Sequence, residues 1–353
     1  MTGPTRPVIT VVVVTWNGVH LLDACLGGLD GQDLDPGLWQ VLVVDNASTD
    51  GTAEHLARAH PGVRVLHSAV NRGFAGGNHL ALAEVRSPYA VLLNNDAVPE
   101  PGFLSALLRA IEAPGAERVA AVTAKVLLQP RFRQLSPGVV ADPARGDLVT
   151  PSAVYRPDAS GTVDVRNSTG NEVTRSGYGR DRDWLRVDSA PEPAAEVFGF
   201  CGAAVLLRTA ALREVGDFDE DFFLYYEDSD LSWRLRAGGW TVRYEPSAVV
   251  RHAHAASSDV RSALFRFHDD RNRLLMLTKN APARLALAAV LRYPLTLASL
   301  TVRQGPRAAF TGTRLRAFGS YLRLLPRMLR RRRDIARRAV VPAHDTAALL
   351  VAD

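Results

Sequence analysis

Residues 8–52 read VITVVVVTWNGVHLLDACLGGLDGQDLDPGLWQVLVVDNASTDGT and contain two apolar runs separated by a helical pattern. The runs Val8–Val14 and Gln40–Asp45 are rich in Val and Leu, as in strands that are covered on both faces. Between them, Val19–Leu29 is predicted to be helical. A strand, a helix and a second strand in this order predict a parallel βαβ unit with a right-handed crossover.

The same alternation continues to residue 125. Further strands are predicted at Val63–His67, Tyr89–Leu93 and Val119–Lys125, and further helices at Thr52–His60, Asn78–Val85 and Phe103–Glu112. The pattern predicts an α/β fold with a mostly parallel central sheet flanked by helices. In such sheets, ligands bind beyond the carboxyl ends of the strands.

Composition excludes several classes of protein. With 353 residues, 47% hydrophobic and 22% charged, the chain is neither disordered nor collagenous. The cysteines, Cys25 and Cys201, supply neither a disulfide framework nor zinc-finger spacing, so we expect a reducing compartment. The first apolar run ends without a cleavage site, and Leu285–Val302 is interrupted by Arg292 and Pro294. We therefore expect a cytoplasmic chain without a membrane-spanning helix.

Two regions depart from the alternation. Residues 129–196 are rich in Pro, Gly, Asp and Arg, and Asn167–Asn171 is predicted to be a turn between strands at Thr162–Val165 and Glu172–Thr174. From Arg284 to Arg338 there are 14 arginines, no lysine and one acidic residue, so this helical segment carries +13 and the remainder −8. Such a basic segment indicates an anionic partner, either phospholipid or nucleic acid.

Polar side chains follow the predicted strands at their carboxyl ends. Asp45 opens the sequence DNASTDGT, the glycine-rich loop Asn71–Asn78 follows the third strand, and Asn94-Asn95-Asp96 follows the fourth. Glycines allow a ligand to approach the backbone, and Asp96 is a hard ligand suited to a divalent cation. Each motif is also compatible with an ordinary turn or helix cap.

Six acidic residues lie within residues 219–230, interleaved with aromatic residues. A solvated acidic face is the ordinary reading, but the aromatic residues favour the wall of a cleft. Asp228 begins a predicted helix, whose dipole favours the ionised carboxylate that a general base requires. His252 and His254 follow a strand-like segment and face the same side, so at least one can reach a metal, although a structural role is the commoner one for histidine.

Five motifs in one order resemble the family 2 inverting glycosyltransferases, particularly bacterial rhamnosyltransferase-like members. They are VVVVTWNG, VVDNASTDGT, NRGFAGGN, LLNNDAVP and GDFDEDFFLYYEDSDLSWRLRAGGW, and the resemblance covers residues 8–280. It implies a GT-A nucleotide-diphospho-sugar transferase fold over residues 1–283. Residues 129–196 would then be an elaborated acceptor-side segment, and residues 284–353 an Arg-rich helical appendix.

The resemblance also implies roles for single residues. Asn94 replaces the first acid of the DxD motif, so the implied Mg²⁺ or Mn²⁺ site on Asp96 and His252 is less charged than in the full motif. Asp228 matches the catalytic base, with Glu227 beside it. The positions implied to bind the nucleotide sugar are Thr15, Asn17, Asp45, Asn71, Gly73, Asn94, Asn95 and Asp96.

The implied function is inverting transfer of a sugar, with rhamnose suggested by the resemblance, from a nucleoside-diphosphate donor to a lipid-linked or polysaccharide acceptor in cell-envelope glycan synthesis. The basic tail then favours a peripheral position on the inner face of the plasma membrane. An oligomerisation or packing role for the tail is the alternative, whereas nucleic-acid binding lacks a base-reading module. Val12–Gly18 lacks the signature loop of a sugar nucleotidyltransferase, and a catalytically weak scaffold that binds nucleotide sugar at the membrane is the non-enzymatic alternative.

Overall fold

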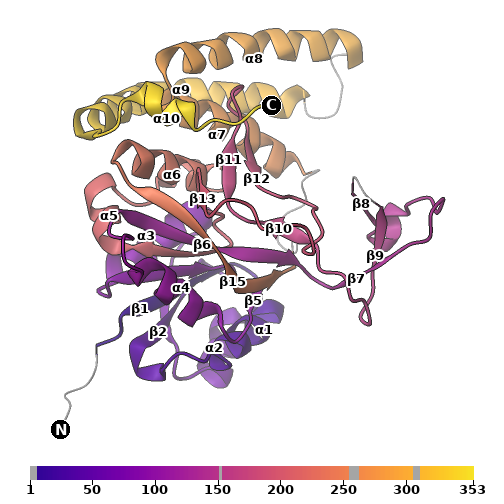
Figure 1. Ribbon diagram of the computed structural model, residues 1–353. Coiled ribbons are helices and arrows are strands. Elements are labelled where there is room, and N and C mark those ends of the chain that lie inside the picture. Colours follow the sequence, from indigo (N-terminus) through magenta and orange to yellow (C-terminus); the bar gives the residue numbers. More distant parts are fainter. Residues whose placement is uncertain (1–5, 151–152, 254–261, 305–310) are drawn as a thin grey trace.

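The computed structural model describes residues 6–150, 153–253, 262–304 and 311–353, which form a mixed α/β structure with a helical C-terminal region (Figure 1). His254 lies outside the described residues. The α/β class and the central sheet flanked by helices, both predicted from the sequence, are confirmed.

The central sheet has ten strands, and the order along its main path is β13-β15-β6-β14-β4-β1-β2-β3, with β10 beside β6 and β5 beside β15. The strands are β1 (Ile9–Thr15), β2 (Trp39–Asp45), β3 (Arg64–His67), β4 (Tyr89–Leu93), β5 (Ala97–Pro99), β6 (Val119–Leu128), β10 (Arg166–Ser168), β13 (Glu196–Val197), β14 (Ala204–Arg208) and β15 (Thr241–His252).

Strand directions place the polar strand ends together. β1 is parallel to β2 and β4, β2 is parallel to β3, and β15 is parallel to β6. β14 lies between β4 and β6 and is antiparallel to both, so β4 and β6 run in the same direction. In register, Thr15 faces Asp45, which faces His67 on its other side. Six strands thus end at one edge of the sheet, where the sequence places its polar motifs.

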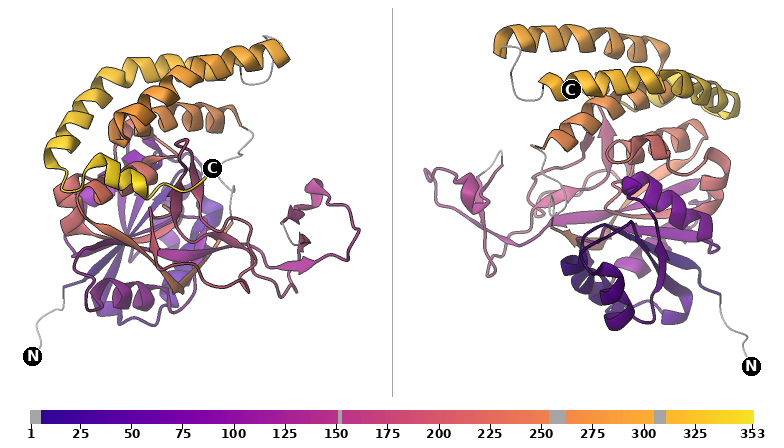
Figure 2. Two further views of the ribbon diagram at one scale, coloured as in Figure 1. Left: turned by 45° about the horizontal axis from the view of Figure 1, so that its top comes forward. Right: turned by 180° about the vertical axis from the view of Figure 1, so that it is seen from behind.

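Helices cover both faces of the sheet (Figures 1 and 2). Val11 and Val13 point into one buried cluster with Leu22 and Leu104, whereas Val12 points into the opposite cluster, because successive side chains of a strand alternate. The helices are α1 (Val19–Asp30), α2 (Thr52–Ala59), α3 (Gly73–Glu84), α4 (Phe103–Glu112), α5 (Thr209–Val215), α6 (Glu227–Ala237), α7 (Ala263–Asn280), α8 (Ala283–Gln304), α9 (Thr311–Arg338) and α10 (Ala343–Ala348). Short 3₁₀ turns are η1 (Pro36–Leu38), η2 (Pro143–Arg145) and η3 (Glu220–Phe222).

The structure corrects two local predictions. The glycine-rich segment is helical from Gly73, five residues before the predicted start, because the Asn71 side chain and the Phe223 carbonyl accept hydrogen bonds from the first turn. Residues 167–171 are a turn between strands only in part, because Asn167 and Ser168 belong to β10 and Asn171 begins the next strand. Strand β10 joins the central sheet, while β11 (Asn171–Val173) pairs with β12 (Gly179–Asp181).

Part of the 129–196 segment projects from the body. β7 (Phe132–Gln134), β8 (Leu148–Val149) and β9 (Val154–Pro157) form a small separate sheet, which protrudes in every view (Figures 1 and 2). The β11–β12 pair instead lies against the body, next to α6 and α7.

The C-terminal helices stack over one side of the body (Figure 2). Tyr321 and Met328 of α9 are buried in the same cluster as Leu274 of α7, and Val351 pairs with the backbone of Val173. The division of the chain at residue 283 stays a prediction.

Arg292 and Pro294, which interrupt the apolar run, do not end the helix, because α8 continues through both residues. Among the described residues, Ala283–Arg303 is the one helix that is long and apolar enough to cross a membrane by length and composition. Its mean hydropathy is 1.6, and 17% of it is buried.

Candidate functional site

The loops after β1 and β2 are tied to each other. Asn17 accepts a hydrogen bond from the Thr49 backbone over 2.7 Å, and its own N–H donates to the Ser48 hydroxyl. Asp45 is buried at the end of β2, where its carboxylate accepts a hydrogen bond from the Ser48 N–H over 3.0 Å. Asp45 therefore caps its own turn, as the alternative interpretation of this motif expected, while lying at the functional edge of the sheet.

The next loop is held against the catalytic region predicted around residue 228. The Asn71 side chain accepts hydrogen bonds from the Gly73 N–H and from Asn46. Gly73 has a positive φ of 65°, and a Cβ atom there would lie 2.3 Å from the Phe223 carbonyl oxygen. Only glycine allows this approach, which joins the start of α3 to the segment preceding α6.

Asp96 and His252 meet at the carboxyl edge of the sheet. The His252 Nε2 lies 3.0 Å from the Asp96 Oδ1, and both residues are buried. The His252 Nδ1 lies 2.8 Å from the Asn167 side-chain oxygen, and the Asn94 amide lies 3.4 Å from Nε2. An imidazole and a carboxylate in contact are a suitable partial ligand set for Mn²⁺ or Mg²⁺, with diphosphate and water supplying the other ligands.

Thr15 and Asn95 join this cluster to the first loop. The Asn95 amide donates to the Thr15 hydroxyl over 2.9 Å, and Thr15 is buried. The predicted positions Thr15, Asn94, Asn95, Asp96 and His252 thus form one contiguous group.

Asp228 lies in the first turn of α6, where it accepts several hydrogen bonds. Its Oδ2 accepts from the Asn171 amide over 2.7 Å and from the Gly202 N–H over 3.3 Å, while its Oδ1 accepts from the Ser229 N–H over 2.6 Å. Burial raises the pKa of Asp228, and these hydrogen bonds oppose the rise by stabilising the carboxylate.

Glu227 differs from its neighbour. It is buried, and its Oε2 has no hydrogen-bond partner among the described residues. Burial, followed by repulsion from Asp228, raises the pKa of Glu227 well above its ordinary value. Glu227 therefore retains a proton more readily than Asp228, whose hydrogen bonds favour the ionised form that a general base requires.

The two centres are bridged by residues that sequence reasoning did not select. Asn167 contacts His252 and Asn171 contacts Asp228, and both come from the segment predicted to be a simple turn. Asp181 faces Asn171 in register, and burial raises its pKa to about 6, with repulsion from Asp228 in the same direction and attraction to His252 against it. The run of polar residues around Asn167 was the feature of the sequence that could have indicated a functional role for this segment.

The surroundings of Asp230 indicate a role in packing. It is fully buried and accepts hydrogen bonds from Lys279 over 2.8 Å, from Arg234 over 3.0 Å and from Asn280 over 2.7 Å. Despite its burial, these cations lower the pKa of Asp230. The third acid of the EDSD sequence therefore joins α6 to α7.

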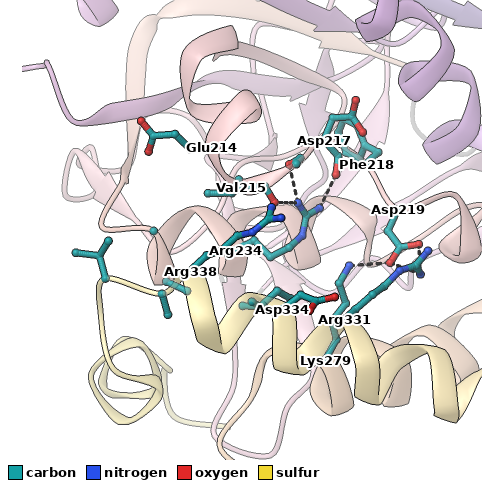
Figure 3. Close-up of a pocket in the computed structure, with 16 residues that line it drawn as sticks. Glu214, Val215, Asp217, Phe218, Asp219, Arg234, Lys279, Arg331, Asp334 and Arg338 are labelled. Carbon is teal, nitrogen blue, oxygen red and sulfur yellow. Dashed lines mark hydrogen bonds and ion pairs between the residues drawn. The ribbon is translucent and has the colours of Figure 1, made fainter.

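A cavity of about 350 Å³ lies beside this ion-pair network, between the α5–α6 region and α9 (Figure 3). In it, Lys279 and Arg331 both contact Asp219 over 2.7 Å. Among the described residues that line the cavity, there is no predicted site residue. The cavity thus marks where α9 is attached to the body, away from the carboxyl edge.

The segment before Asp228 is clamped by α7. Phe223, Tyr225 and Tyr226 all have positive φ angles, between 64° and 70°, which is unusual for residues other than glycine. Asn272 is fully buried, and its amide donates to the carbonyls of Phe222, Leu224 and Tyr225, each over 2.8 Å. This one side chain supports the strained path that leads to α6.

The chain is similar to known sugar transferases. Residues 10–178 match the family described as Glycosyl transferase family 2, and residues 159–270 match Glycosyl transferase family group 2. An N-acetylglucosaminyl-diphospho-decaprenol L-rhamnosyltransferase of Mycobacterium tuberculosis is 30% identical over 320 residues, covering 85% of this chain and 94% of the relative. A pre-mycofactocin glycosyltransferase of the same species is 28% identical over 71% of this chain and 44% of the relative.

Solved structures share the fold. The mannosyltransferase PcManGT from Pyrobaculum calidifontis, in complex with GDP-Man and Mn²⁺, has a TM-score of 0.52 and 20% identity over 98% of this chain and 86% of its own. GalNAc-T7 with UDP, GalNAc and Mn²⁺ has a TM-score of 0.57 and 11% identity over 96% of this chain and 59% of its own.

Proposed function

Because the chain belongs to glycosyl transferase family 2 and has the GT-A fold, we propose that it moves a sugar, with inversion, from a nucleoside-diphosphate donor to a polyprenyl-diphosphate-linked saccharide. The observation that carries this proposal is the pair of centres bridged by Asn167 and Asn171. One centre holds Asp96 and His252, and the other holds Asp228. Rhamnose is the proposed sugar, since the relative named above is a rhamnosyltransferase.

The donor would lie along the carboxyl edge of β1, β2 and β4. Thr15, Asn17, Asp45, Asn71 and Gly73 belong to the loops that would surround the nucleoside, and their mutual hydrogen bonds would keep these loops in place before binding. Asp96 and His252 would hold Mg²⁺ or Mn²⁺, with Asn94 and Asn95 alongside. The cation would neutralise charge on the departing diphosphate.

Asp228 is the proposed general base. It would accept the proton of the acceptor hydroxyl as that oxygen attacks the anomeric carbon, while the bond to the diphosphate breaks on the opposite side of the sugar. Inversion follows from this single in-line displacement. Glu227 is buried and its pKa is raised well above its ordinary value, so it would not take the role of the ionised base.

The C-terminal helices are proposed to hold the enzyme at the cytoplasmic membrane surface, where a lipid-linked acceptor would be found. Leu287, Leu291 and Leu295 recur every fourth residue on α8 and are exposed, and Leu315, Leu322 and Leu329 of α9 are exposed as well. Some tail arginines are engaged elsewhere: Arg314, Arg327 and Arg331 pair with acids of the body. Exposed arginines of the tail, among them Arg292, Arg323 and Arg330, would contact anionic headgroups.

The activity is tested with the purified full chain, thymidine-diphospho-rhamnose, Mg²⁺ or Mn²⁺, and a polyprenyl-diphospho-N-acetylglucosamine acceptor. We expect release of nucleoside diphosphate that depends on acceptor, and a product whose anomeric configuration, determined by NMR, is inverted. Other nucleotide sugars in the same assay test the donor. If the protein binds the donor but releases no nucleoside diphosphate with any acceptor, the scaffold alternative is supported.

Membrane binding is tested by flotation with anionic and neutral vesicles. Replacing Leu291 and Leu295 by Asp should reduce recovery with anionic vesicles at least severalfold, because both side chains are exposed on α8 and are not needed in the core. Replacing the exposed Val140 of the projecting segment by Asp is the matched control. Removing α9 would be a poorer test, because its residues Tyr321 and Met328 are buried in the core and their loss would disturb the fold. Equal recovery of all variants would refute the proposed surface.

A further inference from the structure

A second cluster of metal-binding side chains lies on α1 and α2, separate from the Asp96–His252 centre. Asp23 belongs to α1, His55 to α2, and His60 follows the end of α2. The Nε2 atoms of His55 and His60 approach the same atom, Asp23 Oδ1, at 2.7 and 2.9 Å. The three potential ligand atoms all lie within 4.8 Å of one another.

Both histidines have an ordered backbone and side chains that are largely covered by their surroundings. Each histidine side chain is only 17% exposed. The backbone N–H of His60 donates to the Leu56 carbonyl and that of His55 to the Gly51 carbonyl, and the Leu56 side chain of α2 is buried. The Asp23 side chain is 67% exposed and remains free to adjust. The cluster therefore has two largely covered nitrogen ligands and one exposed oxygen ligand.

The charge of the cluster suits a cation. Hydrogen bonds from His60 and His55 lower the pKa of Asp23, so its carboxylate is ionised. Its described ion pairs are with these two histidines, and neither is with lysine or arginine. Two neutral imidazoles and a carboxylate bear a net charge of −1, which a divalent ion would convert to +1.

We propose that Asp23, His55 and His60 bind a divalent transition-metal ion of the zinc class. Imidazole nitrogen is a good ligand for Zn²⁺, whereas Mg²⁺ prefers oxygen. Neighbouring ligands around tetrahedral zinc are separated by about 3.3 Å, given bonds of about 2.0–2.1 Å. The two nitrogen–oxygen distances, 2.7 and 2.9 Å, are shorter than this value, so the Asp23 side chain would rotate away from the histidines to admit the ion, with water completing the coordination.

The ion would link α1 to α2, the helices that follow the first two strands of the chain. These helices follow β1 and β2, and the same two chain segments already meet through Asn17 with Thr49 and through the Val19 N–H with Asp50. A metal link would therefore stabilise the packing beneath the first two loops. It would take no part in sugar transfer, so the inference does not depend on the proposed function.

The test is zinc titration of the full chain by calorimetry at pH 7.5, in an Asp96→Asn background that weakens binding at the other centre. We expect one zinc per chain at this site, with affinity reduced at least tenfold by His55→Gln or by His60→Gln. Zinc should also raise the melting temperature of the background protein but not of these variants.

His79→Gln is the matched control, because His79 makes a single histidine–aspartate contact with Asp217 over 2.7 Å. It should bind zinc as the background does. Equal zinc affinity in the His55, His60 and His79 variants, or no zinc binding by a folded background protein, would overturn the proposal. Either result would leave the cluster as a hydrogen-bonded pair of histidines on one carboxylate.

Discussion

The side-chain amide of Asn171 donates a hydrogen bond to the carboxylate of Asp228 over 2.7 Å. Asn171 comes from β11, in the irregular 129–196 segment, whereas Asp228 begins a helix of the main body. The contact favours the ionised form of Asp228 against the burial that raises its pKa. The irregular segment thus contributes directly to the electrostatics of the proposed base.

Replacing the proposed base tests its role most directly. Asp228→Asn should lower kcat by about 10²–10⁴-fold, because the amide cannot accept the acceptor's proton. Donor affinity, measured by calorimetry, should change little. Asp30→Asn, an exposed change at the end of α1, is the control. Turnover at the wild-type rate in Asp228→Asn would show that another group accepts the proton.

Removing the Asn171 amide should shift the pH dependence of the reaction. In Asn171→Ala the Asp228 carboxylate loses a hydrogen bond that stabilises it, so its pKa rises further. A base works when ionised, and the acidic limb of the kcat/KM profile should therefore move to higher pH. The profile of Glu172→Gln, whose side chain contacts Arg180 instead, should stay in place. Coincident profiles for Asn171→Ala and wild type would contradict this coupling.

The proposed cation site predicts a metal requirement. EDTA should abolish turnover, and added Mn²⁺ or Mg²⁺ should restore it, because Asp96 and His252 offer a carboxylate and an imidazole 3.0 Å apart. In Asp96→Asn, the metal concentration for half-maximal activity should rise at least tenfold. Full activity of the chelator-treated, metal-free enzyme would refute the assignment.

Asp181 should make stability depend on pH. Its folded pKa of about 6 exceeds the ordinary value of 3.8 because of burial. Between these values the folded state binds more protons than the unfolded state, so the free energy of unfolding falls as pH rises through this window. Asp181→Asn should therefore increase stability at pH 7.5 by on the order of 1–3 kcal/mol, and have little effect below about pH 4.

Asp158→Asn provides a control of opposite sign. Hydrogen bonding from Ser160, followed by Arg133, lowers the pKa of Asp158 to about 2. Its stabilising effect is present at neutral pH and is lost as pH falls from about 4 towards 2. Urea unfolding at several pH values distinguishes the two cases. A stability difference for Asp181→Asn that does not change with pH would show that its carboxyl group has an ordinary pKa.

The alternating part of the fold was predictable because its signals are local. The runs around Val11 and Val43 have the composition of strands buried on both faces, and they became β1 and β2. Part of the proposed site was predictable from the positions of the strand ends, because Asp45 and Asp96 lie at the edge where parallel strands finish. The pattern of apolar residues does not indicate strand direction, so it does not predict that β14 runs antiparallel between β4 and β6.

The irregular segment was not predictable for a physical reason. Asn167 and Asn171 lie in a stretch whose composition is typical of a turn. The Asn167 side chain, however, contacts His252, 85 residues away in sequence, and the Asn171 side chain contacts Asp228, 57 residues away. Turn propensity describes local backbone preferences and contains no information about such distant partners.

Asn272 should prove necessary for the geometry of Asp228. Its amide donates to three carbonyls of the segment 222–226, whose residues Phe223, Tyr225 and Tyr226 have positive φ angles. Asn272→Asp replaces the donor with an acceptor facing these oxygens, so we expect a loss of about 3 kcal/mol in stability. At a temperature where the variant is fully folded, kcat should still fall at least tenfold, because Asp228 is no longer held in position. Leu264→Ala, an exposed change on the same helix, should alter neither quantity. Urea unfolding and steady-state kinetics measure the two effects separately, and a destabilised variant with wild-type kcat would restrict Asn272 to a role in stability.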